Sequence, residues 1–221
     1  MIDVLVPVLR RPQNAELIFT SFAANTPDDC KLTFVCTSGD DAQIAASRAT
    51  GAHILIHPVR AGPGDFAKKI NYGFAHTNGE FVFMGADDLD FHPHWSEIAL
   101  QHMTPSVGVV ATNDKANRQV MRGEFGTHCL IRRSYIDELG GTFDQEPGVV
   151  LYEGYDHNFV DRELCDAARS RRAYAFAKRS IVRHRHPLWR TAPWDPTYKR
   201  AVSKAREDAA LYDERRRTIQ L

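Results

Sequence analysis

The sequence predicts an α/β protein with a mostly parallel central sheet flanked by helices, and three observations point to this class. Apolar, β-branched runs alternate with helix-like segments at short spacing through the first 84 residues, an order that gives a parallel sheet with right-handed crossovers. The run Phe81-Val82-Phe83-Met84 is apolar throughout and bounded by glycines, as in a strand buried on both faces. A charged helical pattern over 197–217 adds a C-terminal helical extension.

In the first half, helical segments separate four strands. The strands are expected at 2–8, 31–37, 53–57 and 81–84, and the helices after residue 12, at 42–50 and at 66–76. The turn after the first strand reads PVLRRPQN and carries neither a dinucleotide fingerprint nor a P-loop. This half is therefore expected to meet phosphate through a metal ion rather than through a glycine-rich loop.

After residue 93 the pattern is less regular. Strands are expected at 107–112, 127–132, 173–177 and 180–184, helices at 95–102, 134–139 and 155–169, and a flexible loop at 113–126. The segment 187–196 is a linker rich in Trp and Pro. Trp189 and Trp194 are expected to anchor the last helix, although a sugar-stacking role is the alternative.

Charge and composition exclude several classes of protein. The 221 residues carry 28 basic and 28 acidic side chains, so no overall charge directs the chain to nucleic acid or to an anionic membrane. No apolar run approaches the roughly 18 residues of a membrane span, and the N-terminus lacks the basic region of a signal peptide. The four cysteines are scattered without a CxxC pair, which predicts reduced thiols and a cytoplasmic protein.

Three carboxylates, Asp87, Asp88 and Asp90, directly follow the strand at 81–84. In open α/β sheets ligands bind at the carboxyl ends of the strands. Hard oxygen ligands there select Mg²⁺ or Mn²⁺, which such sites share with substrate phosphates. The alternative is that these acids cap the helix that begins near residue 94.

Four segments together resemble the GT-A glycosyltransferases, and among them the inverting, nucleotide-sugar-dependent family 2. The segments are VPVLRRP, KKINYGFAHTNGEFVFMGADDLDFHP, THCLIRRSYIDELGGTFDQ and YEGYDHNFVDREL, and they span about residues 2–187. The resemblance implies the Rossmann-like GT-A fold and hexosyl transfer from a nucleoside-diphosphate sugar. It also implies a nucleotide-sugar-binding half at 1–110, an acceptor-binding and catalytic half at 111–187, and a linker and helix at 188–221 outside the match.

The resemblance also implies a Mn²⁺ or Mg²⁺ ion held by the family's DxD motif. Gly85 stands where many relatives have the leading Asp, so the pair is either Asp87 with Asp88 or Asp88 with Asp90. Some GT-A enzymes add a late histidine to the ion, and either His184 or His186 matches that position.

For catalysis, the segment YEGYDHNFVDREL implies a base at Asp156, with Glu153 as the reserve. Asp156 is expected to open the helix at 155–169, where a plain helix cap is the alternative role.

The candidate donor-binding residues lie on the first half of the chain. They are Pro7, Arg10, Asp40, Lys69 and Asp87. Arg11, Asp41 and Lys68 are the neighbours that share these assignments.

Two other functions fit the same pattern. One is a nucleotidyltransferase on a similar sheet, which a glycine-rich first loop would favour. The other is a non-catalytic sugar-nucleotide-binding module. The feature in its favour is Gly85, which stands in the acid motif where many relatives have an Asp. The acceptor stays open among a glycan, a protein, a lipid and a modified nucleobase. A homodimer through the C-terminal helix is a further expectation.

Overall fold

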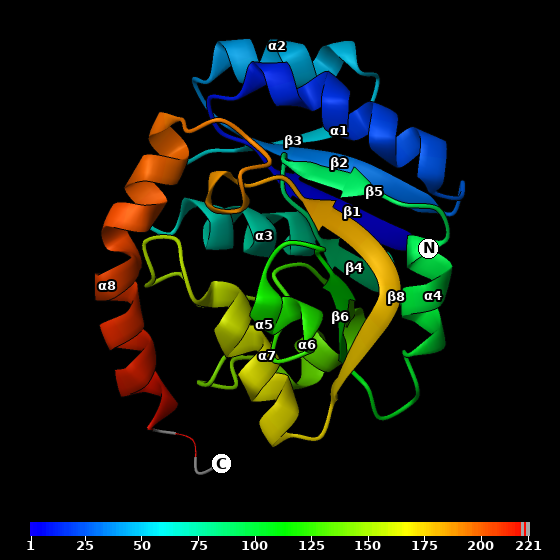
Figure 1. The fold of residues 1–221 in the computed structure, drawn as a ribbon, viewed down its shortest axis with the longest axis vertical. Helices are drawn as coiled ribbons and strands as arrows, with labels where there is room; N and C mark the ends of the chain where they lie inside the picture. The colour runs from blue at the N-terminus through cyan, green and yellow to red at the C-terminus, as the bar shows by residue number, and fades with distance from the viewer. Residues whose placement is uncertain (218, 220–221) are drawn as a thin grey trace.

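A computed structural model describes residues 1–217 and 219, and its centre is one curled sheet (Figure 1). The strands are β1 Ile2–Pro7, β2 Cys30–Thr37, β3 His53–His57, β4 Phe81–Met84, β5 Leu89–Phe91, β6 Val109–Asn113, β7 Cys129–Arg132 and β8 Tyr174–His184. The helices are α1 Pro12–Asn25, α2 Asp41–Ala49, α3 Asp65–Ala75, α4 Trp95–Gln101, α5 Arg118–Met121, α6 Arg133–Leu139, α7 Val160–Ser170 and α8 Pro196–Arg216, with a 3₁₀ turn η1 at Pro187–Trp189.

The strands follow the order β3-β2-β1-β4-β7-β6-β8-β5. Pairs β1–β2, β2–β3, β1–β4 and β6–β8 are parallel, while β4–β7, β6–β7 and β5–β8 are antiparallel. The predicted class, an α/β protein with a mostly parallel sheet and a C-terminal helix, is confirmed. Leu5 of β1 lies beside Met84 of β4, so these two strands end at the same edge of the sheet.

Two apolar cores cover the two faces of the sheet, and strand alternation separates them. On β4, Val82 and Met84 face the core that contains α3, α6 and α7, while Phe83 faces the core that contains α1, α2 and α4. Because successive side chains of a strand point to opposite faces, a fully apolar run such as β4 supplies both cores. Figure 1 shows α1 and α2 layered on one face and α3 on the other.

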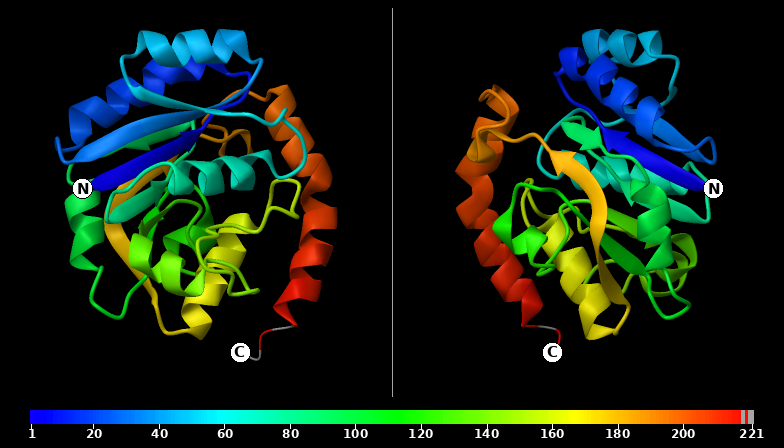
Figure 2. Two further views of the ribbon diagram at one scale, coloured as in Figure 1. Left: turned by 180° about the vertical axis from the view of Figure 1, so that it is seen from behind. Right: turned by 45° about the vertical axis from the view of Figure 1, so that its right-hand side comes forward.

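Helix α8 runs along the side of the molecule away from the N-terminus (Figure 2). Its buried residues are Tyr198, Ala201, Asp208 and Tyr212, whereas Val202, which the sequence placed in the apolar stripe, is 45% exposed. Trp189 and Trp194 are 37% and 48% exposed, so the prediction that they anchor this helix was wrong. Tyr198, Ala201 and Tyr212 of the predicted stripe are buried, and the helix is also held by the buried polar residue Asp208, which apolar periodicity does not reveal.

Four further differences concern the second half. The three-residue strand β5 was not predicted, and the loop at 113–126 contains the short helix α5. The strands expected at 173–177 and 180–184 form one strand, β8, with a register irregularity opposite Thr112 and Asn113. Helix α7 begins at Val160 rather than at residue 155.

All four cysteines are free and buried. Among residues 1–217 and 219, none of the helices combines the length and the apolar character that a membrane span requires. The division at residues 110 and 187 and the dimer through α8 stay predictions.

Candidate active site

A cavity of about 880 Å³ opens at the edge where β1 and β4 end. Six of the nine first-choice candidates from the sequence line it: Pro7, Arg10, Asp87, Asp88, Asp156 and His184. Their alternates Arg11 and His186 line it as well. They come from the loops after β1 and β4, from the loop before α7, and from the end of β8. The first turns of α8 line the opposite wall.

Asp88 is a buried acid of this cavity, with 6% of its surface exposed. Its Oδ2 accepts a hydrogen bond from the hydroxyl of Tyr198 at 2.7 Å and lies 3.3 Å from Nε2 of His184. Its Oδ1 is buried and has no hydrogen-bond partner among the described residues. Burial alone would raise the pKa of Asp88, but the charge and hydrogen bond of His184 and the Tyr198 hydroxyl hold it well below its usual range. A buried carboxylate oxygen without a partner is an uncommon feature that a bound cation would satisfy.

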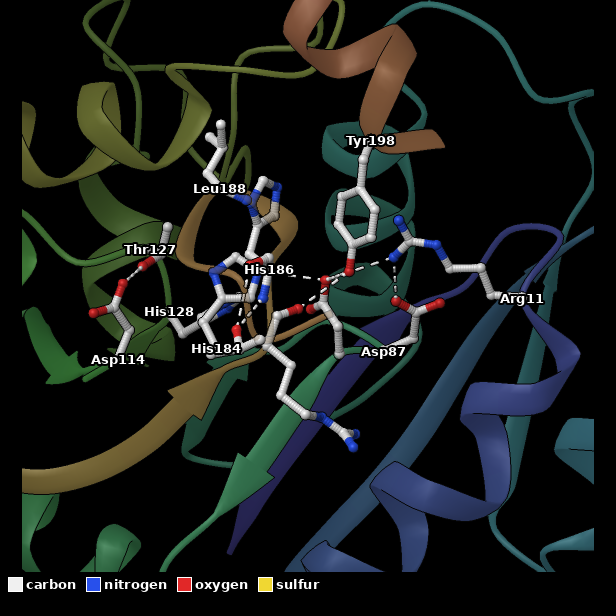
Figure 3. Close-up of polar contacts among 12 residues, drawn as sticks. Arg11, Asp87, Asp114, Thr127, His128, His184, His186, Leu188 and Tyr198 are labelled. Carbon is white, nitrogen blue, oxygen red and sulfur yellow. Dashed lines mark hydrogen bonds and ion pairs between the residues drawn. The ribbon is translucent and has the colours of Figure 1, made fainter. Parts of the chain in front are cut away.

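The register of β5 against β8 brings His184 to Asp88, because Leu89 pairs with His184. His186 lies on the same side, but its Nδ1 accepts the N–H of Leu188. The structure thus brings His184 rather than His186 to the acid (Figure 3). Burial would lower the pKa of His184, yet the carboxylate of Asp88 raises it.

His128 forms the floor of the cavity and was not identified from the sequence. Its Nδ1 lies 3.1 Å from the carbonyl oxygen of Met84, and its Nε2 is buried without a hydrogen-bond partner among the described residues. Burial, together with the nearby His184, lowers the pKa of His128 to about 3. The ring is therefore neutral at ordinary pH.

Arg11 is a buried cation of the site. Its Nη1 donates to Asp87 at 2.9 Å, and its guanidinium stacks 3.9 Å above the ring of Tyr198 (Figure 3). Its Nε lies 2.8 Å from Oδ2 of Asp195. The backbone N–H of Arg11 is fixed by the side chain of Gln43. Burial and the neighbouring Asp88 raise the pKa of Asp87 to about 7, although Arg11 opposes this shift.

Asp156 lines the cavity from a loop rather than from a helix start, because α7 begins four residues later. Its carboxylate accepts two hydrogen bonds from Arg200, at 2.8 and 3.2 Å. Its backbone carbonyl accepts the N–H of Gly64 at 2.9 Å. The reserve candidate, Glu153, does not line the cavity. Its carboxylate accepts a hydrogen bond from the side-chain amide of Asn71.

Three other residues singled out from the sequence do not line the cavity. Lys69 is fully buried, and its ammonium pairs with Asp65 and donates to the carbonyl of Val8. Asp90 lies on β5 with Arg185 at 3.5 Å, and Asp40 accepts the backbone N–H of Arg10. Of the two readings of the acid motif, the structure brings Asp87 and Asp88 together in the cavity and leaves Asp90 outside.

The side chains at Asp88 suit a divalent cation that a substrate also binds, rather than one that the protein encloses alone. Within the described residues, no group of three His, Cys, Asp or Glu side chains could surround a metal ion. Mg²⁺-type sites, however, take one or two protein carboxylates and complete their shell with substrate phosphates and water. The free Oδ1 of Asp88 beside His184 fits such a shared site.

The fold is that of the GT-A glycosyltransferases. It matches a mannosyltransferase from Pyrobaculum calidifontis in complex with GDP-Man and Mn²⁺, at a TM-score of 0.66 and 16% identity over 88% of this chain. It also matches glucosyl-3-phosphoglycerate synthase from Mycobacterium tuberculosis in complex with Mn²⁺, UDP and glucosyl-3-phosphoglycerate, at a TM-score of 0.61 and 18% identity over 97% of this chain.

The chain spans 58% of the mannosyltransferase and 79% of the synthase. No protein-family model and no curated protein sequence matches the chain. The likeness to these solved structures, at such low identity, establishes the fold.

The residues that sequence reasoning missed come mostly from α8. Tyr198 and Arg200 of this helix reach Asp88 and Asp156, and its N-cap residue Asp195 pairs with Arg11. The helix lies outside the resembling segments. An Arg or Tyr on a charged helix carries no sequence signal that separates a site residue from a solvated one. The position of Arg11 directly after the first strand marked it as a candidate for donor binding. Nothing in the sequence indicated that it pairs with Asp87.

Proposed function

We propose that the chain is a metal-dependent glycosyltransferase that moves a hexosyl group from a nucleoside-diphosphate sugar to an acceptor hydroxyl with inversion. One observation supports this most. The unpartnered Oδ1 of Asp88 and the carboxylate of Asp156 line one cavity at the carboxyl edge of the sheet. Ligands of open α/β folds bind at this edge, and the two acids suit the two tasks of the reaction, holding a cation and accepting a proton.

Asp88 and His184 would hold the divalent ion, and Asp87 lies beside them. The ion would neutralise the charge that develops on the leaving diphosphate. The mannosyltransferase and the synthase, which share the fold, were solved with Mn²⁺, and the synthase was also solved with Mg²⁺ and UDP. Family 2 membership and a DxD motif in the Asp87-Asp88 register belong to this proposal.

The donor nucleotide would lie over the loop after β1. Pro7 and Arg10 line the cavity there, and Asp40 fixes the backbone of Arg10. Lys69 would act indirectly, because its buried ammonium holds the carbonyl of Val8 in the same loop. Arg11 supplies a fixed positive charge beside the acid pair, a second means of stabilising a leaving diphosphate.

Asp156 would take the proton of the acceptor hydroxyl while the hydroxyl oxygen attacks C1 of the sugar. The C1–O bond to the diphosphate breaks on the opposite face, so the configuration at C1 inverts. Arg200, whose side chain is 51% exposed, holds the carboxylate of Asp156 from the solvent side. Because its side chain is half exposed, Arg200 can release one of the two oxygens of Asp156. The acceptor hydroxyl would then donate its hydrogen bond to that oxygen.

A panel of UDP-, GDP-, CMP- and dTDP-sugars in a thermal-shift assay, with and without Mn²⁺, tests donor binding. A ligand that binds the native state raises the melting temperature by mass action. The donor that binds is then incubated with the protein and Mn²⁺, and the products are identified. A nucleoside diphosphate supports glycosyl transfer, whereas pyrophosphate would indicate a nucleotidyltransferase.

A second candidate is a non-catalytic module that binds sugar nucleotides. The observation in its favour is that Asp87 and Asp156 are each already paired with an arginine. A donor that raises the melting temperature but releases no product with a broad acceptor panel, including glycans, peptides, lipids and hydroxymethylated DNA, would favour this module over the transferase.

A further inference from the structure

A carboxylate of α8 binds the backbone of the loop that carries Asp156. Asp208 accepts the backbone N–H groups of three successive residues, Asp156 at 2.7 Å, His157 at 3.1 Å and Asn158 at 2.8 Å. It also accepts from the side-chain amide of Asn158 at 3.1 Å. Successive N–H groups that converge in this way form a concave anion-binding site in the backbone.

The carboxylate of Asp208 is well suited to this role. The residue is 3% exposed, so a charge there needs strong partners. Burial alone would raise the pKa of Asp208, but the backbone hydrogen bonds from Asn158, Asp156 and His157 lower it. Hydrogen bonds to an ionised acceptor are roughly twice as strong as neutral ones.

A simpler role for Asp208 would be to fasten α8 to the body of the protein. Helix α8 already has other fastenings further along, since Tyr212 donates to Asp166 and Arg215 binds Glu163 and Asp144. Among the described residues, in contrast, every hydrogen bond that Asp208 accepts comes from residues 156–158. Without this carboxylate the helix would keep those other contacts, whereas three successive N–H groups of the loop would lose their acceptor.

We propose that Asp208 is a positioning residue that sets the direction of the Asp156 carboxylate, so that α8 aligns the base of the reaction. This inference rests on the proposed function, in which Asp156 accepts the acceptor proton. Asp156 is then fixed at three points: its N–H by Asp208, its carbonyl by Gly64, and its carboxylate by Arg200. Displacement of a reacting group by about 1 Å can cost about 100-fold in rate.

The test compares Asp208→Asn with Tyr212→Phe, a matched control that removes one buried hydrogen bond of α8 without touching the loop. Asp208→Asn is expected to lower kcat by about 10- to 100-fold and to leave the donor KM unchanged. Tyr212→Phe should leave both constants unchanged. Asp208→Glu, which restores the charge, should recover part of the lost kcat.

Amide hydrogen exchange supplies a readout that does not depend on activity. In Asp208→Asn the amides of residues 156–158 should exchange faster, while the amides of α7 and α3 keep their protection. In Tyr212→Phe the three loop amides should be unaffected. This measurement also shows whether Asp208→Asn is folded.

The outcomes separate this inference from the proposed function. If wild-type protein turns over a donor and Asp208→Asn has the same kcat, or if its three loop amides exchange as in wild type, the positioning role is wrong. A donor KM that rises in parallel with the fall in kcat would indicate general damage and would also overturn it. If wild-type protein turns over no nucleotide sugar, the proposed function itself fails.

Discussion

At the scale of single residues, the two oxygens of Asp88 have unequal surroundings. Oδ2 lies within reach of Tyr198, His184 and Arg11, while Oδ1 meets no hydrogen-bonding group of the described residues. A buried oxygen left in this state costs about 1–3 kcal/mol. The arrangement is consistent with a ligand that completes the site, and the proposed ligand is a divalent cation.

Replacing Asp88 with Asn should abolish the effect of Mn²⁺ on nucleotide binding. The amide keeps the shape but removes the charge that would attract the cation. In a calorimetric titration, the wild-type protein should bind the donor nucleotide more tightly with Mn²⁺ than with EDTA, and the variant should show no difference. The matched control is Asp90→Asn, since Asp90 lies outside the cavity. A variant of Asp88 that still responds to Mn²⁺ would exclude this residue as a metal ligand.

Replacing Asp156 with Asn should lower kcat by about 100- to 10,000-fold, the usual contribution of a general base. Donor binding should be unchanged, because the proposed base acts on the acceptor. Glu153→Gln is the control, since Glu153 does not line the cavity. Equal losses in the two variants would contradict the assignment of the base to Asp156.

At the scale of elements, the start of α3 contacts residues 153–156, here called the base loop after the role proposed for Asp156, through a glycine. Gly64 has a left-handed backbone with φ of +72°, and a Cβ there would lie 2.4 Å from the carbonyl oxygen of Glu153. Only a residue without Cβ allows this approach. In this conformation the N–H of Gly64 donates to the backbone carbonyl of Asp156. The left-handed backbone of Gly64 therefore fixes the start of α3 against the base loop.

Replacing Gly64 with Ala should reduce both stability and kcat. The left-handed conformation alone costs a residue with Cβ about 1–2 kcal/mol, and the clash with Glu153 adds to this cost. Gly39→Ala is the matched control, because Gly39 has φ of +84° but open space around its Cβ position. Denaturant unfolding should show a larger loss for Gly64→Ala. Equal losses in stability and unchanged kcat would show that the contact with the base loop is unimportant.

The elements also show how far the sequence could predict this protein. β3 and β4 were predicted at their observed bounds, because short apolar runs between turn residues determine them locally. β5 could not be predicted, because a three-residue strand depends on pairing with β8, which is far away in the sequence. The start of α7 was misplaced because Asp156 resembles a helix cap, whereas the N–H groups there are bound by Asp208 of a distant helix.

Some residues of the candidate site could likewise be identified from the sequence, and others only from the three-dimensional structure. Asp87, Asp88 and Asp156 could be identified from their order along the chain and its resemblance to known enzymes. The choice of His184 over His186 required the register of β5 against β8. Tyr198 and Arg200 required the position of α8, which no local pattern determines. The pairing of Arg11 with Asp87 required the contact between the loops that follow β1 and β4.

At the scale of the whole molecule, stability should fall on acidification, and His128 should account for part of the loss. Its folded pKa of about 3 lies below its usual 6.5, so the unfolded chain binds the proton first. The contribution is fully present above about pH 6.5 and is lost as the pH falls toward 3. One pH unit in this window corresponds to about 1.4 kcal/mol.

Urea unfolding of the metal-free protein at about pH 6.5 and pH 5 measures this effect. The loss between these values should be smaller by up to about 2 kcal/mol in His128→Gln than in the wild type. His102→Gln, at an exposed position, should lose as much as the wild type. An acid sensitivity that is the same in all three proteins would contradict the assignment to His128.

Strand β8 has a consequence for how the protein folds. It pairs with β6 along its first part and with the three-residue edge strand β5 at its end. Residues 89–91 of β5 and residues 182–184 of β8 are far apart in the sequence, so their pairing closes a very long loop, a slow step for a folding chain. The pairing of His184 with Asp88 should therefore be among the last native features to appear during refolding.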